Sequence, residues 1–80
     1  MKLKVHPSAR KHGLADADIK HAVEHAMSID DQEDDLRLYL GPGRNAALLE
    51  VVTVARSGRN EMAIHAMTMR ARYRLFLPGD

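Results

Sequence analysis

The N-terminal third of the chain carries one clear helical pattern. In "ADADIKHAVEHAM", residues 15–27, apolar side chains recur at the i, i+3, i+4, i+7 and i+8 spacing of one helical face. These side chains are Ile19, Ala22, Val23, Ala26 and Met27. Asp16 and Asp18 fall in the first turn, where carboxylates favour the positive end of the helix dipole, and Gly13 permits a sharp turn before it. The pattern predicts an amphipathic helix.

The middle of the chain changes to short apolar runs separated by turn residues. The runs are "LRLYL" at 36–40, "ALLEVVTVAR" at 47–56 and "EMAIHAMTM" at 61–69. "GPGRN" at 41–45 separates the first two runs, and "SGRN" at 57–60 separates the second and third. We therefore expect two consecutive hairpins, which make a three-stranded antiparallel meander.

Both ends of the chain add smaller elements. From Met69 onward apolar residues return to helical spacing, and Pro78 and Gly79 end the segment, so a short C-terminal helix is predicted. "KLKV" at 2–5 is a candidate fourth strand at the sheet edge, and Pro7 can begin a short turn of helix. The predicted fold class is α+β, with an N-terminal helical segment, a sheet of three or four strands and a short closing helix.

The faces of the sheet follow if each hairpin closes symmetrically about its turn. Leu40 then opposes Ala47, Arg56 opposes Glu61, and side chains alternate between the two faces. One face is apolar throughout, which matches the apolar stripe of the helix and predicts the core. Its members are Leu36, Leu38, Leu40, Ala47, Leu49, Val51, Met62, Ile64 and Ala66.

The opposite face gathers polar groups among apolar ones. In the same register Arg37 lies directly opposite Glu50, and His65 lies one diagonal step from Glu50, about 7–8 Å between Cα atoms. Two interpretations remain open at this point. In one, Arg37 and Glu50 form an exposed ion pair and His65 is packed beneath the terminal helix. In the other, an imidazole, a carboxylate and nearby arginines form a site that can hold a phosphate.

Composition narrows the class of protein. Eighty residues with 45% hydrophobic and 29% charged side chains predict one small domain over residues 1–80. A core of this size is often completed by a partner or a second copy, so a homodimer is an open alternative. The chain has no cysteine, and neither a secretory signal nor an apolar run of membrane-spanning length is evident. We expect a cytoplasmic protein without membrane contact.

The net charge of +1 hides separate blocks of charge. Both ends of the chain are basic, whereas "DDQEDD" at 30–35 is acidic and lacks the glycine and ligand spacing of an EF-hand. We interpret the acidic run as a solvated loop.

Histidines raise the alternative of a metal site. His21 and His25 stand at i, i+4 on the predicted helix, a spacing that can hold zinc, but no third ligand is evident nearby. Surface histidines are the simpler interpretation, and we expect no metal and no cofactor. A site shared by His6, His12, His21 and His25 is the remaining metal hypothesis.

Several motifs together resemble the BrnT family of type II toxins and, about as well, a related uncharacterised domain family with the same layout. They are "HP" at 6–7, "KHGL" at 11–14 before the helix, "LYLG" at 38–41, "LLEVVTV" at 48–54, and "AIHAM" at 63–67 followed by an arginine-rich helix with a tyrosine. The resemblance covers nearly the whole chain. It implies a RelE-like fold and a metal-independent endoribonuclease that cuts mRNA and is neutralised by an antitoxin encoded beside it.

Two positions depart from the family pattern. Ala15 stands where the family's helix usually has a capping Ser or Thr, at a cost of about 1 kcal/mol in helix stability. The strand that aligns with "IHAM" usually has a small residue at the position of His65 and an arginine at the position of Met67. Arg70 is a candidate to replace that arginine from the start of the helix.

Metal-independent RNA cleavage requires a base, an acid and cations, and the sequence offers candidates for each. His65 and Glu50 are the first catalytic candidates, and His12, in the loop before the helix, is a second acid or base; its alternative role is to fix where the chain enters the helix. The predicted RNA and phosphate ligands are Lys11, Arg37, Arg56, Arg70 and Tyr73, the last by stacking on a base unless it belongs to the core. The alternative function is a non-catalytic module of the same fold that binds RNA or a partner.

Overall fold

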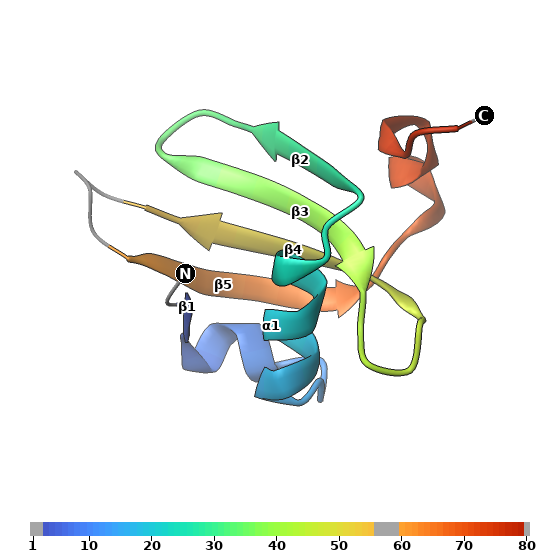
Figure 1. Ribbon diagram of the computed structural model, residues 1–80. Coiled ribbons are helices and arrows are strands. Elements are labelled where there is room, and N and C mark those ends of the chain that lie inside the picture. Colours follow the sequence, from blue (N-terminus) through green and yellow to red (C-terminus); the bar gives the residue numbers. More distant parts are fainter. Residues whose placement is uncertain (1–2, 56–59, 80) are drawn as a thin grey trace.

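The computed structural model describes residues 3–55 and 60–79. Along the chain its elements are β1 (Leu3–Val5), the 3₁₀ helix η1 (Pro7–Arg10), α1 (Asp16–Glu24), β2 (Ser28–Asp31), β3 (Leu36–Pro42), β4 (Leu48–Val54), β5 (Glu61–Thr68) and the 3₁₀ helix η2 (Ala71–Phe76). The strands form one sheet in the order β1-β5-β4-β3-β2, in which β1 runs parallel to β5 and all other pairs are antiparallel (Figure 1). The protein is therefore an α+β domain with a mixed sheet.

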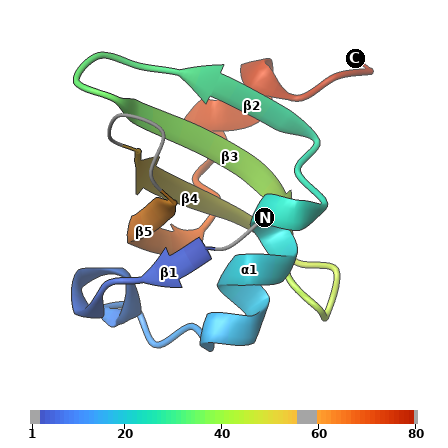
Figure 2. The same ribbon diagram turned by 60° about the vertical axis from the view of Figure 1, so that its left-hand side comes forward.

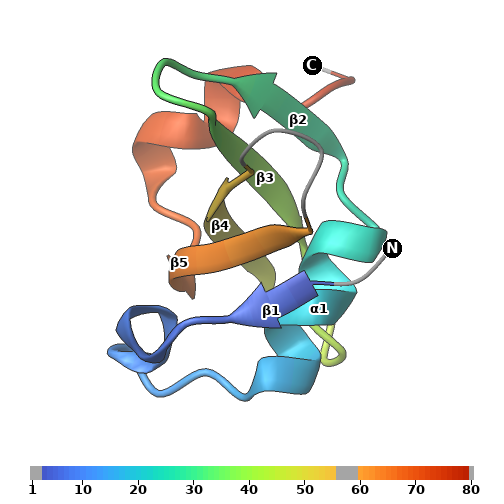
Figure 3. The ribbon, with the colours of Figure 1, turned by 90° about the vertical axis from the view of Figure 1, so that its left-hand side faces the viewer.

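The sheet lies between two unequal layers. Figure 2 shows α1 in front of the strands and η2 behind them, and Figure 3 shows the same elements on the two sides of the twisted sheet. η1 and the loop after it lie near the edge of the sheet formed by β1 and its neighbour β5, below β1 in Figure 3. One face of the sheet is therefore on the α1 side and the other on the η2 side. The direction in which a strand residue projects decides which of the two it meets.

The predicted helix forms as α1, but it ends at Glu24. Ile19, Ala22 and Val23 from its apolar stripe are buried against the sheet. Ala15 occupies the N-cap and contributes no side-chain hydrogen bond, as its chemistry requires. The sheet approaches α1 closely at Gly41 on β3, where a Cβ atom would lie 2.2 Å from the carbonyl oxygen of Ala22.

The predicted register of the β3–β4 hairpin is wrong by three residues. Leu40 pairs with Glu50 instead of Ala47, because β3 continues through Pro42 and the turn begins later, closed by the hydrogen bond from the Gly43 amide to the Ala47 carbonyl. An odd shift reverses the faces of β3 relative to β4. Tyr39 therefore joins the core beneath α1, and Leu38 and Leu40 are buried on the opposite face of the sheet.

The predicted register of the β4–β5 hairpin is confirmed for the first half of β4, which pairs with the second half of β5. Glu50 pairs with Met67 and Val52 with His65, after which a β-bulge inserts Ile64 as an extra residue. The bulge turns Ala63 into the core beneath α1, so the prediction that Met62 and Ile64 line that core is wrong.

The sheet has five strands where the sequence predicted three or four. The edge strand predicted from "KLKV" is confirmed as β1, and the turn of helix at Pro7 as η1. The additional strand is β2, which takes up the start of the acidic run and pairs Asp30 with Leu38 and Asp31 with Arg37. The interpretation of residues 30–35 as a loop holds only beyond Asp31, since cross-strand pairing outweighs the low strand propensity of aspartate.

Candidate functional site

Glu50 is the centre of the candidate site. Its side chain projects from β4 toward the η2 side of the sheet and is completely buried. The backbone N–H of Arg70 and its Nε donate to Oε1, each at 3.0 Å, and Nη2 donates to Oε2 at 2.7 Å. Burial by itself would raise the pKa of this carboxyl, but the hydrogen bonds from Arg70 and His65 outweigh it and lower the pKa to about 2. Glu50 is therefore ionised at neutral pH.

His65 lies beside Glu50, as the diagonal placement predicted. It projects from β5 on the same face, with its Nε2 atom 3.0 Å from Oε2 of Glu50 and its side chain 32% exposed. An ionised carboxylate can only accept hydrogen bonds, so we assign the ring proton to Nε2. In the neutral imidazole this leaves the lone pair on Nδ1, which is the arrangement of a histidine held by a carboxylate and ready to take a proton.

His12 joins this pair from a distant part of the sequence. It lies in the exposed turn between η1 and α1, and its ring meets that of His65 edge to face, with 5.9 Å between centroids and an interplanar angle of 82°. Gly13, with φ of +80°, makes the turn possible. The structure thus brings together His12, Glu50 and His65, which the sequence proposed as catalytic candidates.

Arg70 connects the site to η2. Its guanidinium forms a forked ion pair with Glu50 and stands 5.7 Å from the centre of the Tyr73 ring. Met67 is the residue paired with Glu50 and stands where the sequence resemblance led us to expect an arginine; Arg70 brings its guanidinium to that same carboxylate from the start of η2.

Tyr73 is half-buried and accompanied by a second arginine. Arg72 lies 5.0 Å from the ring centre and donates from Nη2 to the Tyr73 hydroxyl at 3.0 Å, while the Phe76 ring packs edge-on at 5.8 Å. Arg72 was absent from the predicted ligands, although its place beside the tyrosine in "RARYR" was a usable signal. Lys11 is exposed next to His12 and adds a further cation near the histidines.

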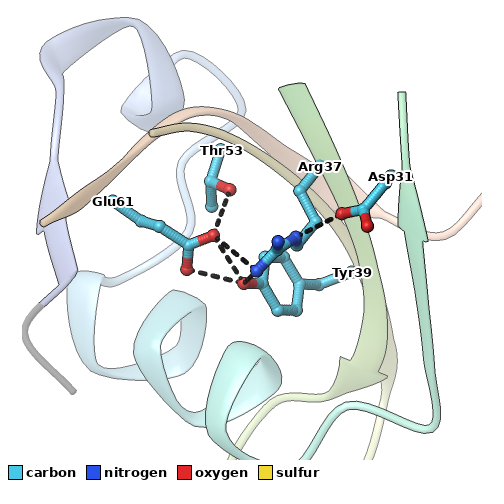
Figure 4. A network of polar contacts seen from close by, with 5 residues as sticks. All are labelled: Asp31, Arg37, Tyr39, Thr53 and Glu61. Atoms are coloured by element: carbon cyan, nitrogen blue, oxygen red, sulfur yellow. Dashed lines mark hydrogen bonds and ion pairs between the residues drawn. The ribbon is translucent and has the colours of Figure 1, made fainter. Parts of the chain in front are cut away.

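Arg37 is on the other side of the sheet, and its predicted pairing with Glu50 is wrong. Because of the register shift it faces the α1 side, where Nε donates to Asp31 at 2.6 Å and Nη1 to Glu61 at 3.3 Å (Figure 4). Glu61 also accepts hydrogen bonds from the hydroxyl groups of Tyr39 and Thr53. This second polar network belongs to a separate region, and no sequence pattern predicted it. Arg56, the remaining predicted ligand, lies outside the described residues.

The four histidines proposed for a shared metal site do not form one group. His21 directs Nδ1 to the carbonyl oxygen of Pro42 at 2.7 Å and stacks against His25, the residue after α1, with 4.2 Å between ring centroids. His6 is tied instead to Ser8 at the start of η1. Across residues 3–55 and 60–79, no three His, Cys, Asp or Glu side chains are arranged so that they could hold a metal ion.

Within the part of the chain that the structure describes, no helix is long and apolar enough to cross a membrane. Comparisons of the chain with known protein families, with curated proteins and with solved structures each gave no match.

Proposed function

We propose that this protein is a metal-independent endoribonuclease acting on mRNA, the toxin of a type II toxin–antitoxin pair, as the resemblance to BrnT toxins implies. The observation that carries the proposal is the hydrogen bond of 3.0 Å between His65 and the buried, ionised Glu50, with the His12 ring alongside. Two imidazoles, one of them oriented by a carboxylate, can supply the general base and the general acid that proton transfer in RNA cleavage requires.

His65 is the proposed general base. Its Nδ1 takes the proton of the ribose 2′-hydroxyl while the 2′-oxygen forms a bond to phosphorus. His12, as an imidazolium, gives a proton to the departing 5′-oxygen as the P–O5′ bond breaks. The products are a 2′,3′-cyclic phosphate and a 5′-hydroxyl, so protons and bonds balance without water or a metal. Glu50 keeps the base in the required tautomer and stabilises the imidazolium that forms.

Cations near the histidines are proposed to bind the phosphate. Arg70 uses Nε and Nη2 for Glu50, yet its side chain is 41% exposed, so Nη1 is the nitrogen it can offer to an anion. Lys11, which precedes His12 in the chain, and Arg72, which lies beside the Tyr73 ring, are also exposed. Positive charge here would stabilise the negative charge that develops on the phosphorane oxygens.

Cleavage of labelled single-stranded RNA in the presence of a metal chelator tests this proposal. We expect the purified protein to cut the RNA, and His65→Ala and His12→Ala each to lose at least about a hundredfold in rate. His25→Ala is the matched control, because His25 is an exposed histidine that directly follows α1 and lies outside the site. Intact RNA with the wild-type protein, or full activity of both variants, would contradict the proposal.

The proposed partner is an antitoxin encoded next to the toxin. Expression of the chain alone is expected to arrest growth, and co-expression of the neighbouring reading frame is expected to restore it. Normal growth on expression of the folded protein would count against a toxin.

A non-catalytic RNA-binding or partner-binding module is the second candidate function. The tight engagement of Arg70 favours it, since two of its guanidinium nitrogens are committed to Glu50 and Met67 supplies no charge. Such a module would bind RNA in a salt-dependent way without cutting it, because counterion release needs only the cations. Anisotropy measurements on RNA at several salt concentrations, analysed for cleavage on the same samples, separate the two functions.

A further inference from the structure

Residues 6–13 form a short hydrogen-bonded hook that holds the loop with His12 against β5. Ala9 on η1 is fully buried, and its amide bonds to the carbonyl oxygen of His6. The amide of Gly13 then bonds to the carbonyl of Arg10, which closes the turn around His12. Residues 6–13 therefore form a continuous unit whose position decides where the His12 ring lies.

The hook contacts β5 at the bulge next to His65. The His6 amide donates to the carbonyl of Ala63 at 2.9 Å, which extends the parallel ladder of β1 by one bond. Beyond it, the Ser8 hydroxyl donates to the carbonyl of Ile64 at 2.7 Å. Ile64 is the extra residue of the bulge and the chain neighbour of His65. A single side-chain hydrogen bond thus joins the unit that carries His12 to the residue that precedes His65.

The number of protons on Ser8 supports the direction of its hydrogen bond to Ile64. A serine hydroxyl has one proton, and the distance of 2.7 Å to Ile64 is typical of a strong O–H···O bond. His6 Nδ1 lies 2.9 Å from the same oxygen and 3.1 Å from the Ser8 amide. Because Nδ1 accepts the Ser8 amide proton, it carries no proton of its own, and the shorter contact assigns the hydroxyl proton to the Ile64 carbonyl.

We infer that Ser8 is a positioning residue for the candidate site, which sets the His12 ring against the His65 ring through the Ile64 carbonyl. The inference rests on the proposed function for its effect on catalysis, but its geometric content is independent of any activity. Ser8 is exposed, and the buried Ala9 and the backbone bond from His6 still hold η1 in its absence. Loss of the hydroxyl should loosen the hook without unfolding the protein.

The test compares Ser8→Ala with Ser8→Thr, which keeps a hydroxyl on Cβ, and with Ser28→Ala as the matched control on β2. The first readout is the nuclear Overhauser contact between the ring protons of His12 and His65. We expect it in the wild type, in Ser8→Thr and in Ser28→Ala, and we expect it to weaken strongly in Ser8→Ala. An undiminished ring contact in Ser8→Ala overturns the inference, whatever the enzyme activity.

The second readout is the kinetics of RNA cleavage. Ser8→Ala is expected to lower kcat about tenfold or more with KM changed less than about twofold, since misplacing a catalytic group affects the chemical step. Ser8→Thr should recover kcat. If the wild type cleaves no RNA, the proposed function fails and the ring contact still decides the role of Ser8. If Ser8→Ala does not fold, Ser8→Cys, of similar size and a weak donor, takes its place in both measurements.

Discussion

Replacing Glu50 by glutamine tests how much the negative charge at the centre of the site contributes to the stability of the protein. The side chain keeps its size and remains completely buried, but it loses the negative charge that accepts hydrogen bonds from Arg70 and His65. The amide group of glutamine also places a donor where the carboxylate offered only acceptors. Glu50→Gln should therefore destabilise the folded protein at neutral pH.

The size of the expected destabilisation follows from the pKa of Glu50, which the folded protein lowers from its usual 4.5 to about 2. Each pKa unit corresponds to about 1.4 kcal/mol, so the ionised carboxylate contributes up to about 3 kcal/mol to the free energy of unfolding. A small domain has a total stability on the order of 5 kcal/mol, so this single group carries a large share.

The sign of the pH dependence is fixed by the direction of the shift. A carboxyl whose pKa is lower in the folded state contributes stability above its unfolded pKa near 4.5 and loses it as the pH falls toward 2. The free energy of unfolding of the wild type should therefore exceed that of Glu50→Gln by about 3 kcal/mol at pH 7. The difference should shrink between about pH 5.5 and pH 2, because glutamine does not titrate.

Urea denaturation followed by circular dichroism at a series of pH values measures this difference. Glu24→Gln is the matched control, because Glu24 is an exposed glutamate at the end of α1. Its effect should stay within about 0.5 kcal/mol at every pH. A difference between wild type and Glu50→Gln that is small at pH 7, or that does not change down to pH 2, would refute the assignment of Glu50 as a buried and strongly paired carboxylate.

Two further predictions concern the α1 side of the sheet. Gly41→Ala should destabilise the protein by about 3 kcal/mol or more in a thermal melt, because its Cβ would lie 2.2 Å from a backbone oxygen of α1; an unchanged melting temperature would show that α1 can move away from β3. Tyr39→Phe removes a hydroxyl that donates to the Glu61 carboxylate, so it should cost about 1–2 kcal/mol while leaving RNA cleavage unchanged. A large loss of cleavage in the folded Tyr39→Phe protein would place the second network in the mechanism.

The sequence was sufficient to predict the part of the site that depends on one hairpin. The register of β4 and β5 follows from the alternation of their side chains, and it places His65 diagonally beside Glu50. The contact of His12 with this pair could not be derived, because it depends on how η1 packs against β5 over a long sequence separation.

The predicted strands differ from the observed ones where the local sequence is compatible with more than one structure. "GPGRN" contains several turn residues, but β3 continues through Gly41 and Pro42, which pair with Leu49 and Leu48. The register predicted from an earlier turn therefore placed Arg37 on the wrong face of the sheet. The acidic run concealed β2, since Asp30 and Asp31 are poor strand formers that are held by pairing with β3. The bulge at Ile64 could not be predicted, because β5 has no glycine that would indicate a bulge.

The central claim is that His65, held by Glu50, activates a ribose hydroxyl. The most direct measurement is mass spectrometry of the products from a DNA oligonucleotide that contains one ribonucleotide, incubated with the protein in the presence of a metal chelator. We expect a single cut after the ribonucleotide, with a 2′,3′-cyclic phosphate on one fragment and a 5′-hydroxyl on the other. Cleavage of the all-DNA oligonucleotide, or fragments ending in a 3′-hydroxyl and a 5′-phosphate, would contradict it.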